Sequence, residues 1–186
     1  MKRFFDIIVS VVFLILLLPI YFLIVIAITF SSSESIIYYS KRIGKNGKTF
    51  MMPKFRTMNS NTPEIASHLI NNPMRHYTLM GYFLRKYSLD ELPQLFSVIK
   101  GDMSIVGPRP ALYNQYDLIN LRIQKNLYIL QPGITGWAQV NGRDDISINK
   151  KVEYDYEYLR RRTFLFDLYI IFLTVYKVLK KDSVLH

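Results

Sequence analysis

An uncharged run of 24 residues, 7–30, carries a proline near its centre, and this combination limits the folds open to the chain. The run is long enough to cross a hydrocarbon core about 30 Å thick. It is longer than the apolar region of a secretory signal, which is usually about 7–15 residues. Pro19, however, lacks a backbone N–H, and its ring clashes with the carbonyl of Ile15. Each half, 7–18 and 20–30, is about 17 Å long as a helix, so it reaches only the middle of a bilayer.

Basic residues flank this run on both sides. Lys2 and Arg3 precede it, and four more follow it: Lys41, Arg42, Lys45 and Lys48. Because positive residues prefer the cytoplasmic side of a membrane, both ends favour the same side. The pattern predicts a re-entrant hairpin over residues 1–33 that enters and leaves one leaflet and breaks at Pro19. A straight spanning helix is the alternative that these residues leave open.

A second hydrophobic stretch, at 164–179, is too short to span a bilayer and is interrupted by Asp167 and Lys177. At 100° per residue, the polar residues of this stretch and two basic residues that flank it fall within an arc of about 100° on a helix. These residues are Arg160, Asp167, Thr174, Lys177 and Lys181. The wide apolar face predicts an amphipathic helix over 164–181 that lies in the membrane interface. An ordinary core helix is the alternative.

The middle of the chain has the signals of a helical domain with one small β element. "SIIYYSKRIGKNGKTFMMPKFRTM" (35–58) contains two β-rich runs around Asn46-Gly47, which predicts a hairpin. Helical spacing recurs in 80–87, 91–100, 112–123 and from 152 onward, whereas 130–145 is rich in turn residues. We expect a mainly α fold with a small β-hairpin, divided into a membrane segment, 1–33, and a cytoplasmic catalytic domain, 34–186.

Charge and cysteine content narrow the function. The chain has 24 basic and 14 acidic residues, a net charge of +10, which indicates an anionic partner such as a phosphate-bearing substrate or an anionic membrane. It has no cysteine, which excludes disulfides and thiolate metal sites. No phosphate-cradling Gly-x-x-x-x-Gly-Lys-[Ser/Thr] loop is present. Since no compact nucleic-acid-binding signature is present either, we expect no nucleic acid partner.

Two adjacent acids, Asp90 and Glu91, stand in "SLDELPQL" (88–95). Ser88 followed by Glu91 fits a capping box, in which the serine caps a helix N-terminus and the glutamate reaches back. A catalytic carboxylate pair is the other interpretation. These eight residues alone do not choose between the two.

Several basic residues stand beside glycines and prolines. Lys54 and Arg56 are two apart, which puts them on one face of an extended strand, Arg109 lies between two prolines, and Arg143 follows a turn. Guanidinium groups match phosphate oxygens in a bidentate manner. Each residue alone is typical of a solvated surface. Together with the acid pair and the apolar run, they indicate a site that holds a phosphate-rich substrate at a bilayer surface.

Three segments resemble a known family. "KFRTM", "FLRKYSLDELPQLFSVIKGDMSIVGPRP" and "QPGITGWAQVNGR" are similar to the monotopic bacterial sugar transferases, or polyprenol-phosphate phosphoglycosyl transferases. The resemblance runs from "RFFDIIVS" to "LTVYKVLKK", and the chain looks like the small form that consists of the catalytic domain alone. It implies transfer of a sugar 1-phosphate from a UDP-sugar to polyprenol (undecaprenyl) phosphate with release of UMP. This is the first membrane step of a bacterial glycan pathway, at the cytoplasmic face of the inner membrane, and it requires Mg²⁺.

The same resemblance implies roles for individual residues. Asp90 would be the nucleophile and Glu91 its partner, and we also expect both to bind Mg²⁺. The expected substrate-binding residues are Lys54, Arg56, Arg85, Arg109 and Arg143. Two positions depart from the family pattern: Leu18 stands where many relatives have serine, and Gln131 where relatives often have arginine, which would remove one positive charge near the site.

These residues leave three interpretations open, of which two are enzymatic mechanisms and one is not enzymatic. A carboxylate can attack phosphorus and form an acyl phosphate, which divides one displacement into two. Alternatively, Asp90 and Glu91 are only metal ligands in a single displacement. In the third, the chain is a non-enzymatic membrane adaptor that binds lipid headgroups through its basic face.

Overall fold

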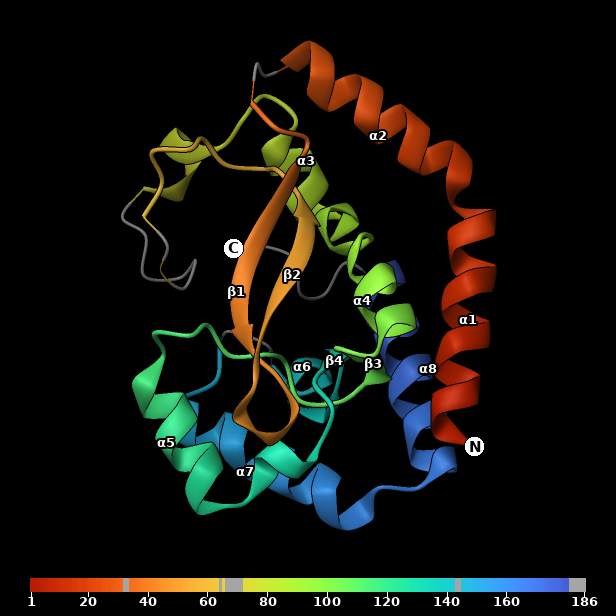
Figure 1. Ribbon diagram of the computed structural model, residues 1–186, viewed down its shortest axis with the longest axis vertical. Helices are drawn as coiled ribbons and strands as arrows, with labels where there is room; N and C mark the ends of the chain where they lie inside the picture. Colours follow the sequence, from red (N-terminus) through yellow and green to blue (C-terminus); the bar gives the residue numbers. More distant parts are fainter. Residues whose placement is uncertain (32–33, 64, 66–71, 143–144, 181–186) are drawn as a thin grey trace.

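The apolar run forms two helices with a bend between them. The computed structural model describes residues 1–186 except 32–33, 64, 66–71, 143–144 and 181–186. Helices α1 (Lys2–Leu16) and α2 (Leu18–Ser31) meet at an angle of 62° and run along one edge of the molecule (Figure 1). No single helix among the described residues has the length and apolar composition needed to cross a bilayer. The bent pair α1–α2 has them when its two helices are taken together.

The break begins two residues before Pro19. Leu17 has left helical geometry, whereas Pro19 lies in the first turn of α2, where a backbone N–H has no helical partner in any case. Leu17 N–H donates to the Phe13 carbonyl and Tyr21 N–H donates to the Leu17 carbonyl, both at 2.9 Å. Helical hydrogen bonds therefore reach the bend from both sides.

The predicted β-hairpin is confirmed. Strands β1 (Ile37–Ile43) and β2 (Thr49–Phe55) are antiparallel, with Tyr38 opposite Lys54. A short 3-10 turn, η1 (Lys45–Gly47), connects them, and Asn46 and Gly47 both have positive φ there. The Asn-Gly pair supplies this conformation at low steric cost.

Short elements form the middle of the chain: η3 (Pro73–His76), α3 (Gly81–Lys86), η4 (Leu89–Glu91) and α4 (Gln94–Lys100). Helix α4 ends at Lys100, where the helical spacing over 91–100 also ends, and the next residue, Gly101, adopts the left-handed conformation with φ of 105°. The later elements are α5 (Tyr116–Gln124), η5 (Leu127–Ile129), α6 (Trp137–Val140), α7 (Ile148–Arg161) and α8 (Phe164–Lys180). The fold is mostly helical with a small hairpin, in agreement with the prediction.

A second sheet was not predicted. Strands β3 (Ser104–Val106) and β4 (Gly133–Thr135) are parallel. Strand β4 lies within 130–145, a stretch rich in turn residues for which no strand was predicted. Glycines allow the two segments to approach closely, because a Cβ atom on Gly133 would lie 2.1 Å from the Gly107 nitrogen and one on Gly136 would lie 2.1 Å from the Gly107 oxygen. This contact brings the loop of Arg109 next to α6.

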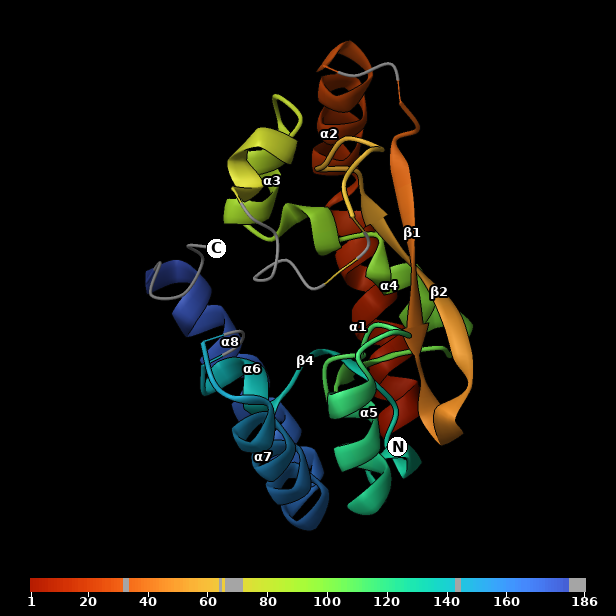
Figure 2. The same ribbon diagram turned by 90° about the vertical axis from the view of Figure 1, so that its left-hand side faces the viewer.

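The hairpin lies on one side of the molecule, and α6, α7 and α8 lie on the other (Figure 2). The main core fills the space between them, with buried side chains that include Val98, Met103, Val106, Leu127, Val152 and Ile170. Helix α2 packs separately, through Ile24 and Ile28, against Phe55 and Leu84.

The outward faces of three helices are apolar and exposed. Exposed side chains include Val12, Ile15 and Leu16 in α1, Phe22, Leu23 and Phe30 in α2, and Leu165, Phe172 and Val175 in α8. Exposed apolar surface of this extent marks a site of interaction with a membrane or another protein.

The polar arc of α8 turns inward. The Asp167 carboxylate accepts hydrogen bonds from Lys2 Nζ at 2.6 Å and from Tyr158 OH at 2.7 Å. The Thr174 hydroxyl lies 2.7 Å from that of Thr135. The predicted helix is therefore present with a wide apolar outer face. Part of its polar side binds the protein rather than solvent, and Lys181 lies outside the described residues.

Candidate active site

The two acids stand in a short irregular segment, not at the start of a long helix. Ser88 has a φ of 55°, in the left-handed region, and its side chain makes no capping hydrogen bond to η4. The regular helix α4 begins only at Gln94. The capping-box interpretation is therefore wrong, because the backbone conformation of Ser88 is not the extended one that a capping serine requires.

Glu91 is held by two cations. Its Oε1 atom lies 2.8 Å from Lys54 Nζ and 2.8 Å from Arg109 Nη2. Burial alone would raise the pKa of Glu91, but the charges and hydrogen bonds of Arg109 and Lys54 outweigh burial and hold this pKa well below its usual range. Glu91 is thus ionised at neutral pH and fixes the positions of two cations.

Asp90 has a different environment. Its side chain is buried, the whole residue is 5% exposed, and its Oδ2 atom lies 3.9 Å from Lys54 Nζ. Burial raises the pKa of Asp90 and the Glu91 charge adds to this effect, whereas Lys54, Arg85 and Arg109 oppose it. Two adjacent carboxylates therefore have pKa values shifted in opposite directions, which is typical of an acid pair with divided roles.

Asp90 opens into a pocket of about 150 Å³ with basic walls. The cations that line it are Arg42, Lys54, Arg56, Arg85 and Arg109. Four of the five predicted substrate-binding residues are thus together with Asp90, and the fifth, Arg143, lies outside the described residues. This combination suits an anionic ligand with several phosphate oxygens.

Two of these arginines also hold the protein together. Arg56 binds Glu34 Oε2 at 2.9 Å and donates to the carbonyl and hydroxyl of Ser35, so it ties the segment after α2 to the end of β2. Arg85 contacts the Met58 sulfur at 3.3 Å and lies over the Tyr77 ring.

Residues 1–181 match the family described as bacterial sugar transferase. The chain belongs to the bacterial sugar transferase family. It is 40% identical over 185 residues to the uncharacterized sugar transferase EpsL of Bacillus subtilis, covering 99% of this chain and 90% of that protein. It is 38% identical over 189 residues to the exopolysaccharide production protein ExoY of Sinorhizobium fredii, covering 94% and 83%.

A longer relative has a named activity. The UDP-glucose:undecaprenyl-phosphate glucose-1-phosphate transferase of Escherichia coli is 39% identical over 186 residues, which cover 95% of this chain and 40% of that protein. The prediction of a bacterial sugar transferase, and hence of an enzyme, is confirmed.

Arg42 of this sugar transferase lines the pocket but was not among the predicted substrate-binding residues. Its guanidinium donates to the Ser40 hydroxyl and to the Pro110 carbonyl, which places it beside the loop of Arg109. Tyr38, Ser40 and Arg42 alternate along β1, and all three line the pocket. This alternation along β1, in which Tyr38 pairs with Lys54, is a sequence signal that could have predicted Arg42 as a pocket residue. The prediction above used Arg42 only as one of the basic residues that flank the apolar run.

A buried ion pair behind the transferase pocket was also missed. Arg122 in α5 binds Asp155 in α7 through Nη2 at 2.6 Å and through Nε at 3.0 Å. Its third nitrogen donates to the backbone carbonyl of Arg109 at 2.8 Å. The pair therefore positions Arg109, and because its members are 33 residues apart, local sequence carries no signal for it.

Asp90 and Glu91 fit an Mg²⁺ site in which water and substrate phosphates supply the other ligands. Within the described residues, no cluster of three or more histidine, aspartate or glutamate side chains is arranged to hold a metal. Mg²⁺ usually takes one or two carboxylates and obtains its other ligands from water and substrate phosphates. Asp90 and Glu91 fit this arrangement, although Glu91 already offers one oxygen to two cations.

The expectation for Gln131 was wrong. This residue lines a separate cavity of about 290 Å³ together with Lys2, Arg3 and Asp6, and its amide donates to the Gly101 carbonyl. The exchange of arginine for glutamine there removes no charge from the Asp90 pocket, because the two cavities share no lining residue.

Proposed function

We propose that this sugar transferase moves a sugar 1-phosphate from a UDP-sugar to polyprenol (undecaprenyl) phosphate and releases UMP. The observation that carries the proposal is a buried Asp90 carboxylate in a pocket with five basic side chains. The printed activity of the Escherichia coli relative supports the two substrates.

In the first displacement, an Asp90 oxygen attacks the phosphorus that bears the sugar. A new oxygen–phosphorus bond forms, and the bond from this phosphorus to the bridging oxygen breaks, so that its electron pair leaves on UMP. The product on the enzyme is an aspartyl phosphosugar. Lys54, Arg85 and Arg109 counter the negative charge of the donor, which would otherwise repel the carboxylate.

In the second displacement, a phosphate oxygen of the polyprenol phosphate attacks the same phosphorus. The aspartyl oxygen–phosphorus bond breaks, the Asp90 carboxylate is restored, and a polyprenol-diphosphate sugar is released. Because a phosphate monoester has a second pKa near 6, the acceptor is mostly dianionic at pH 7 and needs no base. Glu91, whose pKa is held low, is a poor base and serves to orient Lys54 and Arg109.

Bound Mg²⁺ would neutralise charge on the donor phosphates. Asp90 and Glu91 are the residues that would hold it.

We also propose that residues 1–33 dip into the cytoplasmic leaflet of the inner membrane and that α8 lies in its interface. The exposed apolar faces of α1, α2 and α8 support this placement. The basic residues on both sides of the apolar run support the cytoplasmic side.

The test uses purified protein, a set of UDP-sugars and a short-chain polyprenol phosphate, with UMP release as the readout. Asp90→Asn should lower the rate by at least about 10³-fold, since it removes the nucleophile. With UDP-sugar alone, the wild type should carry a phosphosugar on Asp90 and should exchange labelled UMP into the donor. A single displacement predicts neither the phosphosugar on Asp90 nor the exchange of labelled UMP, and an adaptor predicts no UMP release. The absence of the adduct and the exchange, or the absence of UMP release, would reject the covalent mechanism.

A further inference from the structure

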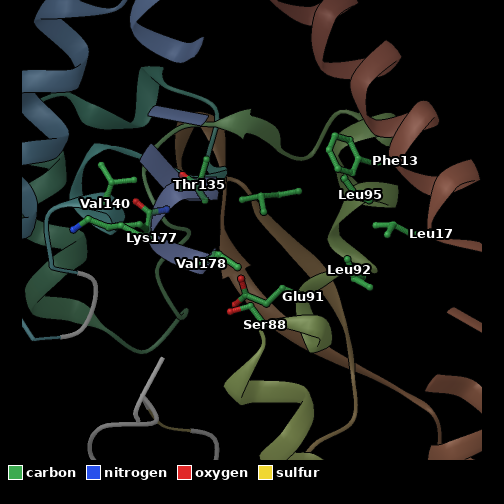
Figure 3. A pocket seen from close by; sticks show the side chains of 13 residues that line it. Phe13, Leu17, Ser88, Glu91, Leu92, Leu95, Thr135, Val140, Lys177 and Val178 are labelled. Atoms are coloured by element: carbon green, nitrogen blue, oxygen red, sulfur yellow. Dashed lines mark hydrogen bonds between the residues drawn. The ribbon is translucent and has the colours of Figure 1, made fainter. Parts of the chain in front are cut away.

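A second cavity, of about 250 Å³, has Ser88 and Glu91 in its lining (Figure 3). Phe13 of α1 and Leu17 at the bend form one wall, and Val178 of α8 and Val140 of α6 lie opposite. Glu91 lines this cavity, whereas Asp90 lines the basic pocket. Glu91 therefore lies between the two cavities, because it binds Lys54 and Arg109, which line the basic pocket.

The walls of this second cavity are continuous with exposed apolar surface. Beside Phe13 and Leu17, the α1 residues Val12 and Leu16 are exposed, and beside Val178 the α8 residue Val175 is exposed. An apolar ligand could thus extend from the cavity over the outer faces of both helices. Since ligand pockets usually measure about 300–1,000 Å³, a cavity of this size holds only one end of a long chain.

Gln139 is one of the polar residues in the lining of this mostly apolar cavity, together with Ser88, Glu91, Thr135, Thr174 and Lys177. Its residue is 8% exposed, and neither its amide nitrogen nor its amide oxygen has a hydrogen-bond partner among the described residues. A buried amide without partners is unfavourable, so such a group indicates a missing polar ligand. Gly136 permits this position, because a Cβ atom there would lie 2.7 Å from Gln139 Oε1.

We propose that this cavity receives the phosphate-proximal isoprene units of the polyprenol phosphate acceptor, and that Gln139 Nε2 donates a hydrogen bond to its phosphate. The inference rests on the proposed function and adds the place of the acceptor. The donor then occupies the basic pocket and the acceptor enters between α1 and α8, so that their phosphates meet at the acid pair. A membrane-embedded chain can reach this cavity from the apolar faces of the two helices.

The test measures acceptor binding without turnover. Trp137 is the only tryptophan and stands two residues before Gln139 in α6, so its fluorescence should change on binding. The probes are a twenty-carbon prenyl phosphate, the matching prenyl alcohol and phosphatidic acid. Val178→Phe fills the cavity, and Ile123→Phe, on the exposed face of α5 and in the lining of neither cavity, is its control.

Val178→Phe should weaken binding of both prenyl compounds by about tenfold, whereas Ile123→Phe should bind them as the wild type does. Gln139→Leu should weaken binding of the prenyl phosphate but not of the prenyl alcohol, because the amide contacts the phosphate alone. Wild-type affinity of Val178→Phe or Gln139→Leu for prenyl phosphate would overturn the proposal. So would equal binding of phosphatidic acid, which would assign the cavity to phospholipid. If these binding differences appear but no sugar phosphate is transferred, the proposed function is wrong, whereas the proposed binding site for prenyl phosphate is supported.

Discussion

Arg122 donates a hydrogen bond from Nη1 to the backbone carbonyl of Arg109 at 2.8 Å while its other nitrogens hold Asp155. The position of the Arg109 loop therefore depends on an ion pair between α5 and α7. Arg109 in turn contacts Glu91 at 2.8 Å. A chain of contacts thus connects the interior of the helical layer to the acid pair.

Asp155→Asn should reveal this dependence. Loss of the carboxylate leaves the Arg122 charge buried and should lower the free energy of unfolding by about 3–5 kcal/mol. The variant should also raise KM for the UDP-sugar, because Arg109 loses its fixed position. Denaturant unfolding and initial rates check these expectations. Glu153→Gln, which removes an exposed ion pair on the same helix, is the control and should change neither quantity. Equal behaviour of the two variants would contradict the positioning role.

Lys54→Met should change the pH dependence of transfer. Burial raises the pKa of Asp90, and Lys54 lowers it, together with Arg85 and Arg109. Removal of Lys54 should raise this pKa further. Because the reactive form is the carboxylate, the acid limb of kcat/KM should move to higher pH. The measurement is a pH–rate profile, with Lys48→Met at the exposed hairpin turn as the control. An acid limb at the wild-type pH in Lys54→Met would argue against Asp90 as the group that titrates.

Glu91→Gln should lower stability in a pH-dependent manner. The folded-state pKa of Glu91 is depressed, so its ionised form stabilises the fold fully above the unfolded value of about 4.3, and this contribution declines as pH falls toward the folded pKa. The stability difference between wild type and variant should be largest at pH 7 and should shrink at pH 3. Urea unfolding at both values checks this. A difference that stays constant with pH would show that the carboxylate charge is not responsible.

Gly133→Ala should disrupt the contact between β3 and β4. The new methyl group would meet the Gly107 nitrogen at 2.1 Å, a backbone atom that cannot rotate away. Overpacking of this kind costs about 1–3 kcal/mol or more. Gly47→Asn is the matched control, since no atom lies within 4 Å of that position and asparagine tolerates its positive φ. Thermal unfolding of both variants checks the expectation, and a Gly133→Ala protein as stable as the control would disprove the close approach.

Local signals predicted the elements that local chemistry determines. Asn46-Gly47 predicted the hairpin turn, helical spacing over 91–100 predicted α4, and Pro19 predicted the break in the apolar run, although the break begins at Leu17. The adjacent acids and the basic residues around them were found in the same manner, and most of them line one pocket.

Features that depend on distant contacts were not predicted. The strands β3 and β4 are three residues long and show no alternation, so only their mutual packing defines them. Ser88 matched a capping pattern, but tertiary structure imposes a left-handed conformation on it. The Arg122–Asp155 pair and the unpaired amide of Gln139 likewise arise from contacts that no short stretch of sequence encodes.

The ion pair between Lys2 and Asp167 joins residues that are 165 positions apart. The ribosome adds Lys2 165 residues before Asp167. Domains generally fold as synthesis proceeds from the N-terminus. Helix α1 therefore emerges long before its partners Ser104 and Asp167 exist. During translation the apolar face of α1 therefore needs lipid or a chaperone to cover it, and its full set of native neighbours exists only when α8 has been made.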